Sequence, residues 1–216
     1  MVSDSLQGKV VVVTGGDSPS TVPVAAELAR RGAVLSVQYD TSFADARDLV
    51  RGIEKDGGQA IAVRAALTDE SRMEALCRRT MGALGALDAL LVDTSAAAPG
   101  HGEAAPAEAF DALRHRLEGW LAPAHAALRT LASQQRSGAV VYLTAGAGPD
   151  AALARSFVPQ LAAGARRCAV RINAVAAAPG PADAVRGVVD LVAALTAGEL
   201  SRLSGAVLAL DTAPLD

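Results

Sequence analysis

The chain has 216 residues, 20 basic and 23 acidic side chains, and a formal net charge of −3. This slightly acidic composition gives no reason to expect nucleic acid or an anionic membrane as a partner. A chain of this length is typical of one domain with a sizeable core, so we expect a single domain over residues 1–216. The two cysteines, Cys77 and Cys168, have no metal-binding or redox spacing, and we expect no metal site.

The first apolar run, VVVV, follows the segment MVSDSLQGK. It is too short to span a membrane, and no basic segment precedes it as in a signal peptide. We therefore expect a cytoplasmic protein without a membrane partner.

Seven short apolar runs, rich in β-branched residues, alternate with stretches of helical periodicity. The runs predict strands at 10–13, 34–37, 60–63, 89–92, 140–143, 171–175 and 206–210. The stretches between them predict helices at 22–31, 43–56, 70–81, 107–134, 149–166 and 182–196. Unbroken apolar runs are typical of parallel strands covered on both faces. We predict an α/β protein with one Rossmann-like, doubly wound parallel sheet of about seven strands and helices on both faces.

Residues at the predicted helix ends agree with these assignments. Gly32 follows the first helix, and Gly57 and Gly58 follow the second, where left-handed C-cap residues belong. Asp69 precedes the third helix and is expected to cap its N-terminus.

Four segments carry a recognisable pattern in a fixed order: GKVVVVTGGDSPSTVPVAAELARRGAVLSVQYD, LDALLVDTSA, GAVVYLTAGAG and VRINAVAAAPG. The first combines a strand, a glycine-containing turn, a helix and a second strand. Together the segments resemble the short-chain dehydrogenase/reductase family, and within it the ketoacyl-reductase-like branch, across nearly the whole chain. The resemblance implies the fold of an NAD(P)-dependent reductase, but most positions at which that family does chemistry are changed here.

The first turn of the family reads TGxxxGxG, and its last two glycines let the backbone approach the cofactor pyrophosphate. Thr14, Gly15 and Gly16 match this pattern, but Pro19 and Thr21 stand in place of those two glycines. Proline removes an N–H donor, and threonine adds a branched side chain where the phosphate would lie. The changes argue against ordinary dinucleotide binding.

Three further cofactor positions differ from the family. Asp40 lies one place after the usual NAD-selecting acid, and Ala66 replaces the aspartate that contacts adenine. The NNAG segment after the fourth strand is replaced by DTSA at 93–96. We therefore expect no cofactor, or NADP or NAD bound only weakly. The candidate residues for such weak binding are Thr14, Gly15, Gly16, Asp17, Ser18, Asp40 and Asp93.

The catalytic positions implied by the resemblance are a serine, a tyrosine that donates a proton, and a lysine that lowers the pKa of the tyrosine. The serine position falls on Ala145, beside Thr144, which is the remaining candidate hydroxyl. The tyrosine and lysine positions fall near Ala147 and Ala151. None of the three alanines supplies a catalytic group.

The rest of the chain does not supply the missing groups. Its two lysines, Lys9 and Lys55, lie far in sequence from the fifth strand, and Tyr142 lies inside that strand, where we expect a core position. The asparagine of the family's long fourth helix falls on Arg116 or Leu117. Composition alone therefore excludes tyrosine–lysine hydride chemistry.

Two segments are shorter than the resemblance implies. One joins the fifth strand to the next helix, and the other is the substrate lid expected after Pro179 and Gly180, which we predict to be deleted. Without a lid, little remains to enclose a substrate or exclude water.

Other polar and aromatic residues have two possible roles. His115 and Glu118 lie one turn apart on the fourth helix, as a ligand pair or a surface pair, and His101 lies in an Ala/Gly/Pro-rich loop. Trp120, the one tryptophan, suits either the core or an interface, in which Phe157 would be a second anchor.

We interpret the chain as a pseudoenzyme of this family without independent oxidoreductase activity. It would act as a structural or regulatory subunit, paired with a catalytically intact relative or with itself through helices 107–134 and 149–166. The alternative is an atypical NAD(P)-dependent oxidoreductase or ketoreductase, or a cofactor-independent cyclase or lyase, with a pocket formed by Asp93, Ser95, His101 and Thr144. A third hypothesis is a nucleotide-sensing binder that keeps a weakened site.

Overall fold

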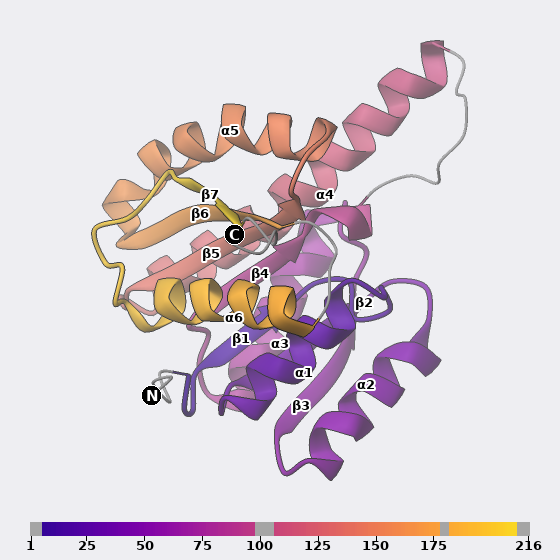
Figure 1. Cartoon of the computed structure of the whole chain (residues 1–216), viewed down its shortest axis with the longest axis vertical. Helices are drawn as coiled ribbons and strands as arrows, with labels where there is room; N and C mark the ends of the chain where they lie inside the picture. Colours follow the sequence, from indigo (N-terminus) through magenta and orange to yellow (C-terminus); the bar gives the residue numbers. More distant parts are fainter. Residues whose placement is uncertain (1–5, 98–105, 178–181, 211–216) are drawn as a thin grey trace, which may run out of the picture.

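The computed structural model describes residues 6–97, 106–177 and 182–210, and its architecture confirms the predicted α/β fold (Figure 1). The described residues form one parallel seven-stranded sheet in the order β3-β2-β1-β4-β5-β6-β7. The strands are β1 (Val10–Val13), β2 (Val34–Tyr39), β3 (Gln59–Arg64), β4 (Ala89–Asp93), β5 (Gly138–Ala145), β6 (Val170–Ala177) and β7 (Val207–Leu210). Each predicted strand is present, with its ends shifted by only a few residues.

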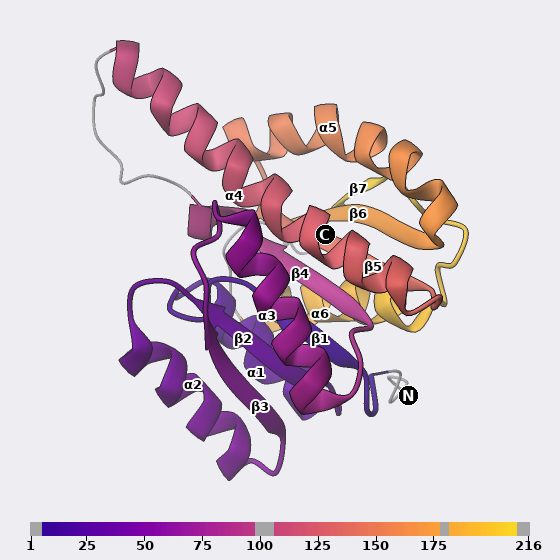
Figure 2. The ribbon, with the colours of Figure 1, turned by 180° about the vertical axis from the view of Figure 1, so that it is seen from behind.

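Helices cover both faces of the sheet, as predicted. One face carries α1 (Thr21–Arg30), α2 (Phe43–Lys55) and α6 (Ala182–Ala197), and the view of Figure 1 shows α1 and α6 in front of the strands. The other face carries α3 (Glu70–Leu84), α4 (Pro106–Ser133) and α5 (Pro149–Ala165), with α3 and α4 in front in Figure 2. Two short 3₁₀ turns, Thr94–Ala97 and Arg166–Cys168, follow β4 and α5. Nowhere in the described part of the chain does a helix have the length and apolar character needed to cross a membrane.

The side chains of each strand alternate between the two cores. In β1, Val12 belongs to the core beneath α3, α4 and α5, whereas Val11 and Val13 belong to the core beneath α1, α2 and α6. All four valines of β1 are buried, because both faces are covered. The unbroken apolar run that predicted this strand is thus explained by its central position.

The connection from β6 through α6 to β7 is left-handed. It crosses the sheet in the same direction as the connection from β5 through α5 to β6, but α6 lies on the opposite face from α5. Nearly all parallel crossovers are right-handed, so this one is an exception. Here the valines and Leu195 of α6 belong to the same core as Leu28 of α1.

Three aromatic side chains meet in the core between β5, α4 and α5. The ring centroid of Trp120 lies 6.2 Å from that of Tyr142 and 5.3 Å from that of Phe157. The Trp120 indole donates a hydrogen bond to the Thr94 carbonyl at 3.3 Å, and the Tyr142 hydroxyl donates to the Trp120 carbonyl at 3.0 Å. Trp120 and Tyr142 are both 0% exposed. The core role of Tyr142 is confirmed, and the interface role considered for Trp120 is wrong, because no part of that side chain reaches the surface.

The predicted helix ends are also observed. Asp69 caps α3 by accepting a hydrogen bond from the Arg72 N–H at 3.1 Å. Gly32 and Gly57 have φ angles of +90° and +84°, which lie in the left-handed region. These two glycines end α1 and α2 and turn the chain into β2 and β3.

Candidate functional site

The candidate site lies at the carboxyl ends of the strands, between β1 and β4. In the sheet order β2-β1-β4, the connections diverge to opposite sides at this point, and doubly wound sheets bind their ligands in the crevice formed there. The turn from β1 to α1 and the 3₁₀ turn after β4 flank this crevice. The predicted cofactor residues of both segments are therefore brought together.

The backbone N–H groups of the β1–α1 turn donate hydrogen bonds to another residue of the protein. Gly15, at φ +72°, donates its N–H to Gln38 Oε1 at 2.8 Å, and Gly16 donates to the Gln38 carbonyl at 2.7 Å. The Gln38 amide in turn donates to the Ala65 carbonyl at 2.6 Å and is 1% exposed. Sequence reasoning missed Gln38, although a polar residue near the end of the buried β2 strand was the available signal.

Asp93, at the end of β4, is a buried carboxylate with hydrogen bonds on both oxygens. Oδ2 accepts from the hydroxyls of Ser20 and Thr21, each at 2.6 Å. Oδ1 accepts from the N–H and the hydroxyl of Ser95 at 2.9 and 2.7 Å. The Asp93 N–H donates to the Thr14 hydroxyl at 3.0 Å, which joins β4 to β1. With 3% exposure, Asp93 binds the first turn of α1 rather than facing an open pocket.

Asp17 makes a second carboxylate contact within the turn. Its Oδ2 accepts from the Thr41 N–H at 3.0 Å, the Thr41 hydroxyl at 2.9 Å and the Ser42 N–H at 3.1 Å. Burial by itself would raise the pKa of Asp17, but the hydrogen bonds from Ser42 and Thr41 outweigh it and lower that pKa below its usual value. Asp17 thereby ties the β1–α1 turn to the loop that precedes α2.

The described residues of the site line a small hollow. A hollow of about 50 Å³ lies at the carboxyl edge. Pockets that hold small molecules measure roughly 300–1,000 Å³. Its lining includes Gly15, Asp17, Asp40, Leu67, Ala96 and His115. Asp40 and His115 thus meet at one small hollow.

The three alanines that the resemblance places at the catalytic positions do not lie on one helical face. Ala145 ends β5 and is exposed, Ala147 is exposed in the turn before α5, and Ala151 is wholly buried in the first turn of α5. Because α5 begins at Pro149, the spacing of four residues between Ala147 and Ala151 does not stack them along a helix. Thr144 is buried, and its hydroxyl lies 3.4 Å from the Ala145 carbonyl rather than in contact with the Asp93 cluster.

Both lysines lie at the opposite edge of the sheet. Lys9 precedes β1 and pairs with Asp88 at 3.5 Å, at the amino ends of β1 and β4. Lys55 is the last residue of α2, which returns the chain to the start of β3. Tyr142 is enclosed in the core, and burial strongly raises its pKa.

The remaining polar candidates take part in ordinary contacts. Arg116, at one of the two possible asparagine positions, pairs with Asp150 at 3.1 Å and links α4 to the start of α5. Glu118 accepts from Arg114 at 3.1 Å. Burial raises the pKa of the Cys77 thiol to about 11, which keeps it protonated at neutral pH. The described residues hold no His/Cys/Asp/Glu cluster arranged for a metal, and His101, Pro179 and Gly180 lie outside the described ranges.

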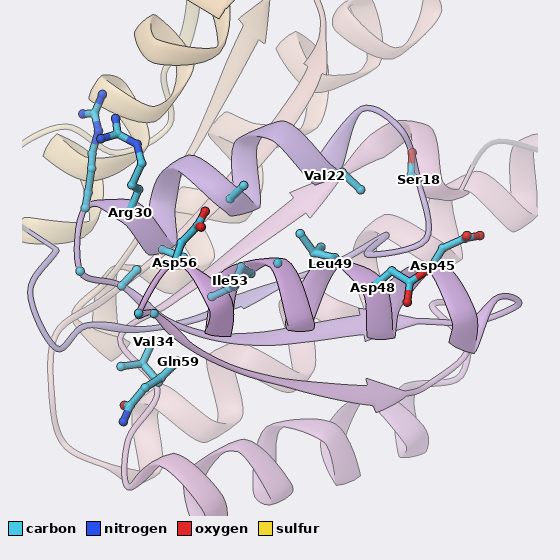
Figure 3. A pocket seen from close by; sticks show the side chains of 18 of the residues that line it. Ser18, Val22, Arg30, Val34, Asp45, Asp48, Leu49, Ile53, Asp56 and Gln59 are labelled. Atoms are coloured by element: carbon cyan, nitrogen blue, oxygen red, sulfur yellow. The ribbon is translucent and has the colours of Figure 1, made fainter.

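A larger hollow, of about 1060 Å³, lies between α1 and α2 (Figure 3). Val22, Leu49 and Ile53 form its apolar wall, and Asp45 and Asp48 lie toward one end. None of the three alanines predicted at the catalytic positions is among its lining residues. The hollow reaches the β1–α1 turn at Asp17, Ser18 and Pro19, and Asp17 also lines the smaller hollow of the candidate site.

The family model described as "short chain dehydrogenase" matches residues 9–186. The chain belongs to the short-chain dehydrogenase family. A short-chain type dehydrogenase/reductase from Mycobacterium marinum has the same fold, with a TM-score of 0.83 over 98% of both chains at 19% identity.

Two curated proteins show which short-chain dehydrogenases the chain is similar to. Hydroxynaphthalene reductase arp2 of Aspergillus fumigatus is 40% identical over 83 residues, which are 38% of this chain and 30% of the relative. Trihydroxynaphthalene reductase PfmaI of Pestalotiopsis fici is 32% identical over 111 residues, 51% of this chain and 39% of the relative. The match spans well under half the length of both relatives. Both relatives are named as reductases.

Proposed function

We propose that this short-chain dehydrogenase does not itself transfer hydride and serves as a structural or regulatory subunit, paired with itself or with an intact reductase of its family. One observation carries the proposal: both lysines lie at the edge of the sheet opposite the candidate site. A phenol acts as a proton donor near neutral pH only if its pKa is lowered by a nearby positive charge or hydrogen bonds. The candidate site has no lysine for this task, and Tyr142 is sealed in the core.

The residues present fit NAD(P) poorly. The amides of Gly15 and Gly16 are bound to Gln38, and Thr21 and Asp93 fill the first turn of α1. A pyrophosphate needs free N–H donors and space at this position. We therefore assign no catalytic step to the cofactor.

The reductase names of the relatives support a second candidate, an atypical NAD(P)-dependent oxidoreductase on the same scaffold. A cofactor-independent cyclase or lyase would use the same site. The polar cluster of Asp93, Ser20, Thr21 and Ser95 is the observation in its favour, because it gathers a carboxylate and three hydroxyls at the usual ligand edge.

Cofactor titration and turnover separate these candidates. We expect isothermal titration of the purified protein with NADH or NADPH to show no saturable heat, and no oxidation of either cofactor with ketoacyl or hydroxynaphthalene substrates. A bound cofactor at a hundredfold excess over its Kd would stabilise the protein by about 2.7 kcal/mol, which thermal unfolding would detect. Low-micromolar binding, or turnover lost on Asp93→Asn, would instead establish the second candidate.

An exposed apolar stripe on α4 supports the proposed pairing. The first half of α4 projects from the body of the protein (Figures 1 and 2). Phe110, Leu113 and Leu121 on this helix are 77%, 45% and 40% exposed. Their spacing places them along one side of the helix, and large exposed apolar surfaces are typical of protein interfaces.

We expect the double substitution Phe110→Glu/Leu113→Glu to convert the associated protein to a monomer without lowering its stability, because both side chains are exposed. Light scattering after size exclusion measures the first effect and urea unfolding the second. Arg114→Gln on the same segment is the matched control and should leave association unchanged. A wild-type protein that is monomeric at tens of micromolar, and that recovers no partner from its native source, would contradict the pairing.

A further inference from the structure

We propose that Asp93 and Asp17 take the places of the dinucleotide phosphates, so that the protein's own carboxylates close the cofactor site from within. The inference rests on the proposed function, because it explains how this fold persists without a bound cofactor. It goes further because it attributes the closed site to two carboxylates and not only to the loss of the glycines at positions 19 and 21.

The first step concerns the N-terminus of α1. A helix N-terminus carries partial positive charge and favours an anion, and in this fold that anion is the cofactor pyrophosphate. Here α1 has no acidic residue in its own first turn. Asp93, 72 residues away from Thr21 in sequence, places a carboxylate there instead, 2.6 Å from the Ser20 and Thr21 hydroxyls.

Thr21 contributes to this closure through its hydroxyl group. It replaces a glycine of the family turn, it is 1% exposed, and its hydroxyl is one of the donors to Asp93. The threonine therefore holds the carboxylate that stands in for the phosphate. Ser95 holds the other oxygen of the same carboxylate at 2.7 Å.

The second step concerns the loop between β2 and α2, where the resemblance places the ribose-reading residues. Two successive N–H groups, of Thr41 and Ser42, point at one oxygen of Asp17 at 3.0 and 3.1 Å. Paired backbone N–H groups of this kind form anion-binding concavities. Asp17 uses both of them, so they are not available to a ribose or its 2′-phosphate.

The two contacts have a joint consequence. A bound dinucleotide would have to displace both carboxylates. Its phosphates would then lie beside them, and negative charges close together repel. Restoring glycine at Pro19 and Thr21 would leave Asp17 in place and would leave Asp93 buried at the same position. Glycines alone are therefore not expected to reopen the site.

Anion rescue tests the Asp93 assignment. Asp93→Ser should lower the unfolding temperature, and inorganic pyrophosphate should then raise it by about 2–4 °C, the shift expected for a ligand that contributes about 1 kcal/mol. Wild type and Asp56→Ser, a variant at an exposed aspartate, should not respond. An Asp93→Ser protein that responds no more than these two controls would overturn the assignment.

Acid unfolding tests Asp17 independently, should Asp93→Ser fail to fold. The pKa of Asp17 is lowered in the folded protein, so its stabilising effect is present above the usual value of 3.8 and is lost as the pH falls below it. Asp17→Asn should therefore lose part of the acid sensitivity of the wild type in this range. Identical acid profiles would show that Asp17 is not engaged as proposed.

Binding of NADPH separates this inference from the proposed function. The wild type and Pro19→Gly/Thr21→Gly should not bind, whereas adding Asp17→Ser and Asp93→Asn to those glycines should give binding at least tenfold tighter than the glycine variant. Equal binding by the two variants would overturn the closure by carboxylates while leaving the proposed function intact. Low-micromolar binding by the wild type would overturn both.

Discussion

Replacing Ala151 with lysine should destabilise the protein by about 3–5 kcal/mol, the usual cost of an unpaired buried charge. Ala151 is the position at which the resemblance places the family lysine, and it is 0% exposed in the first turn of α5. An ammonium group placed there would lose its hydration without gaining a partner. Urea unfolding at neutral pH measures the loss.

Ala152→Lys is the matched control, since its side chain is exposed on the same turn of α5. The lysine introduced at either position lies in the first turn of α5, where a positive charge is unfavourable. The difference in stability between the two variants therefore measures the effect of burial. We expect Ala152→Lys to change stability by no more than about 0.5–1 kcal/mol. Equal stability of the two variants would show that position 151 reaches solvent, and would make an enzyme with restorable chemistry the better candidate.

Trp120→Ala should cost about 3–5 kcal/mol, as expected for a large aromatic side chain removed from a core. Trp120 contacts Tyr142 and Phe157 and donates to the Thr94 carbonyl, so the substitution removes ring contacts and a hydrogen bond together. Urea unfolding at two protein concentrations distinguishes a core role from an interface role. The loss of a core side chain lowers the free energy of unfolding by the same amount at both concentrations.

Leu121→Ala is the control for Trp120→Ala. The Leu121 side chain is 40% exposed at the next position of α4. Its removal should lower the free energy of unfolding by much less than Trp120→Ala does. If Leu121→Ala were the more costly change and its effect depended on protein concentration, the apolar stripe on α4 would contribute to folding as well as to pairing.

We propose a short-chain dehydrogenase in which the groups at the carboxyl edge of the sheet are hydrogen-bonded to one another and not to a ligand. Gln38 satisfies the turn amides, and Asp93 and Asp17 satisfy the donors that would face an anion. On this proposal, the site does not depend on a bound cofactor for its stability. This suits a subunit with a structural task.

Much of the fold was predictable because its signals are local. The β-branched runs follow from strands buried on both faces, and the cap at Asp69 and the left-handed Gly32 follow from the needs of helix ends. The changed catalytic positions, from Ala145 to Ala151, remain predictions from the resemblance. The chain has only Lys9 and Lys55, so no arrangement could bring another lysine to them.

The sequence by itself thus determined the element order, the doubly wound sheet and the absence of a tyrosine–lysine pair. The tertiary structure alone decided which face α6 covers, since the usual right-handed rule would have placed it beside α5. It also decided that Trp120 is core and that Asp93 reaches Thr21. These features depend on packing between segments far apart in the chain, and neither periodicity nor spacing within one segment carries that information.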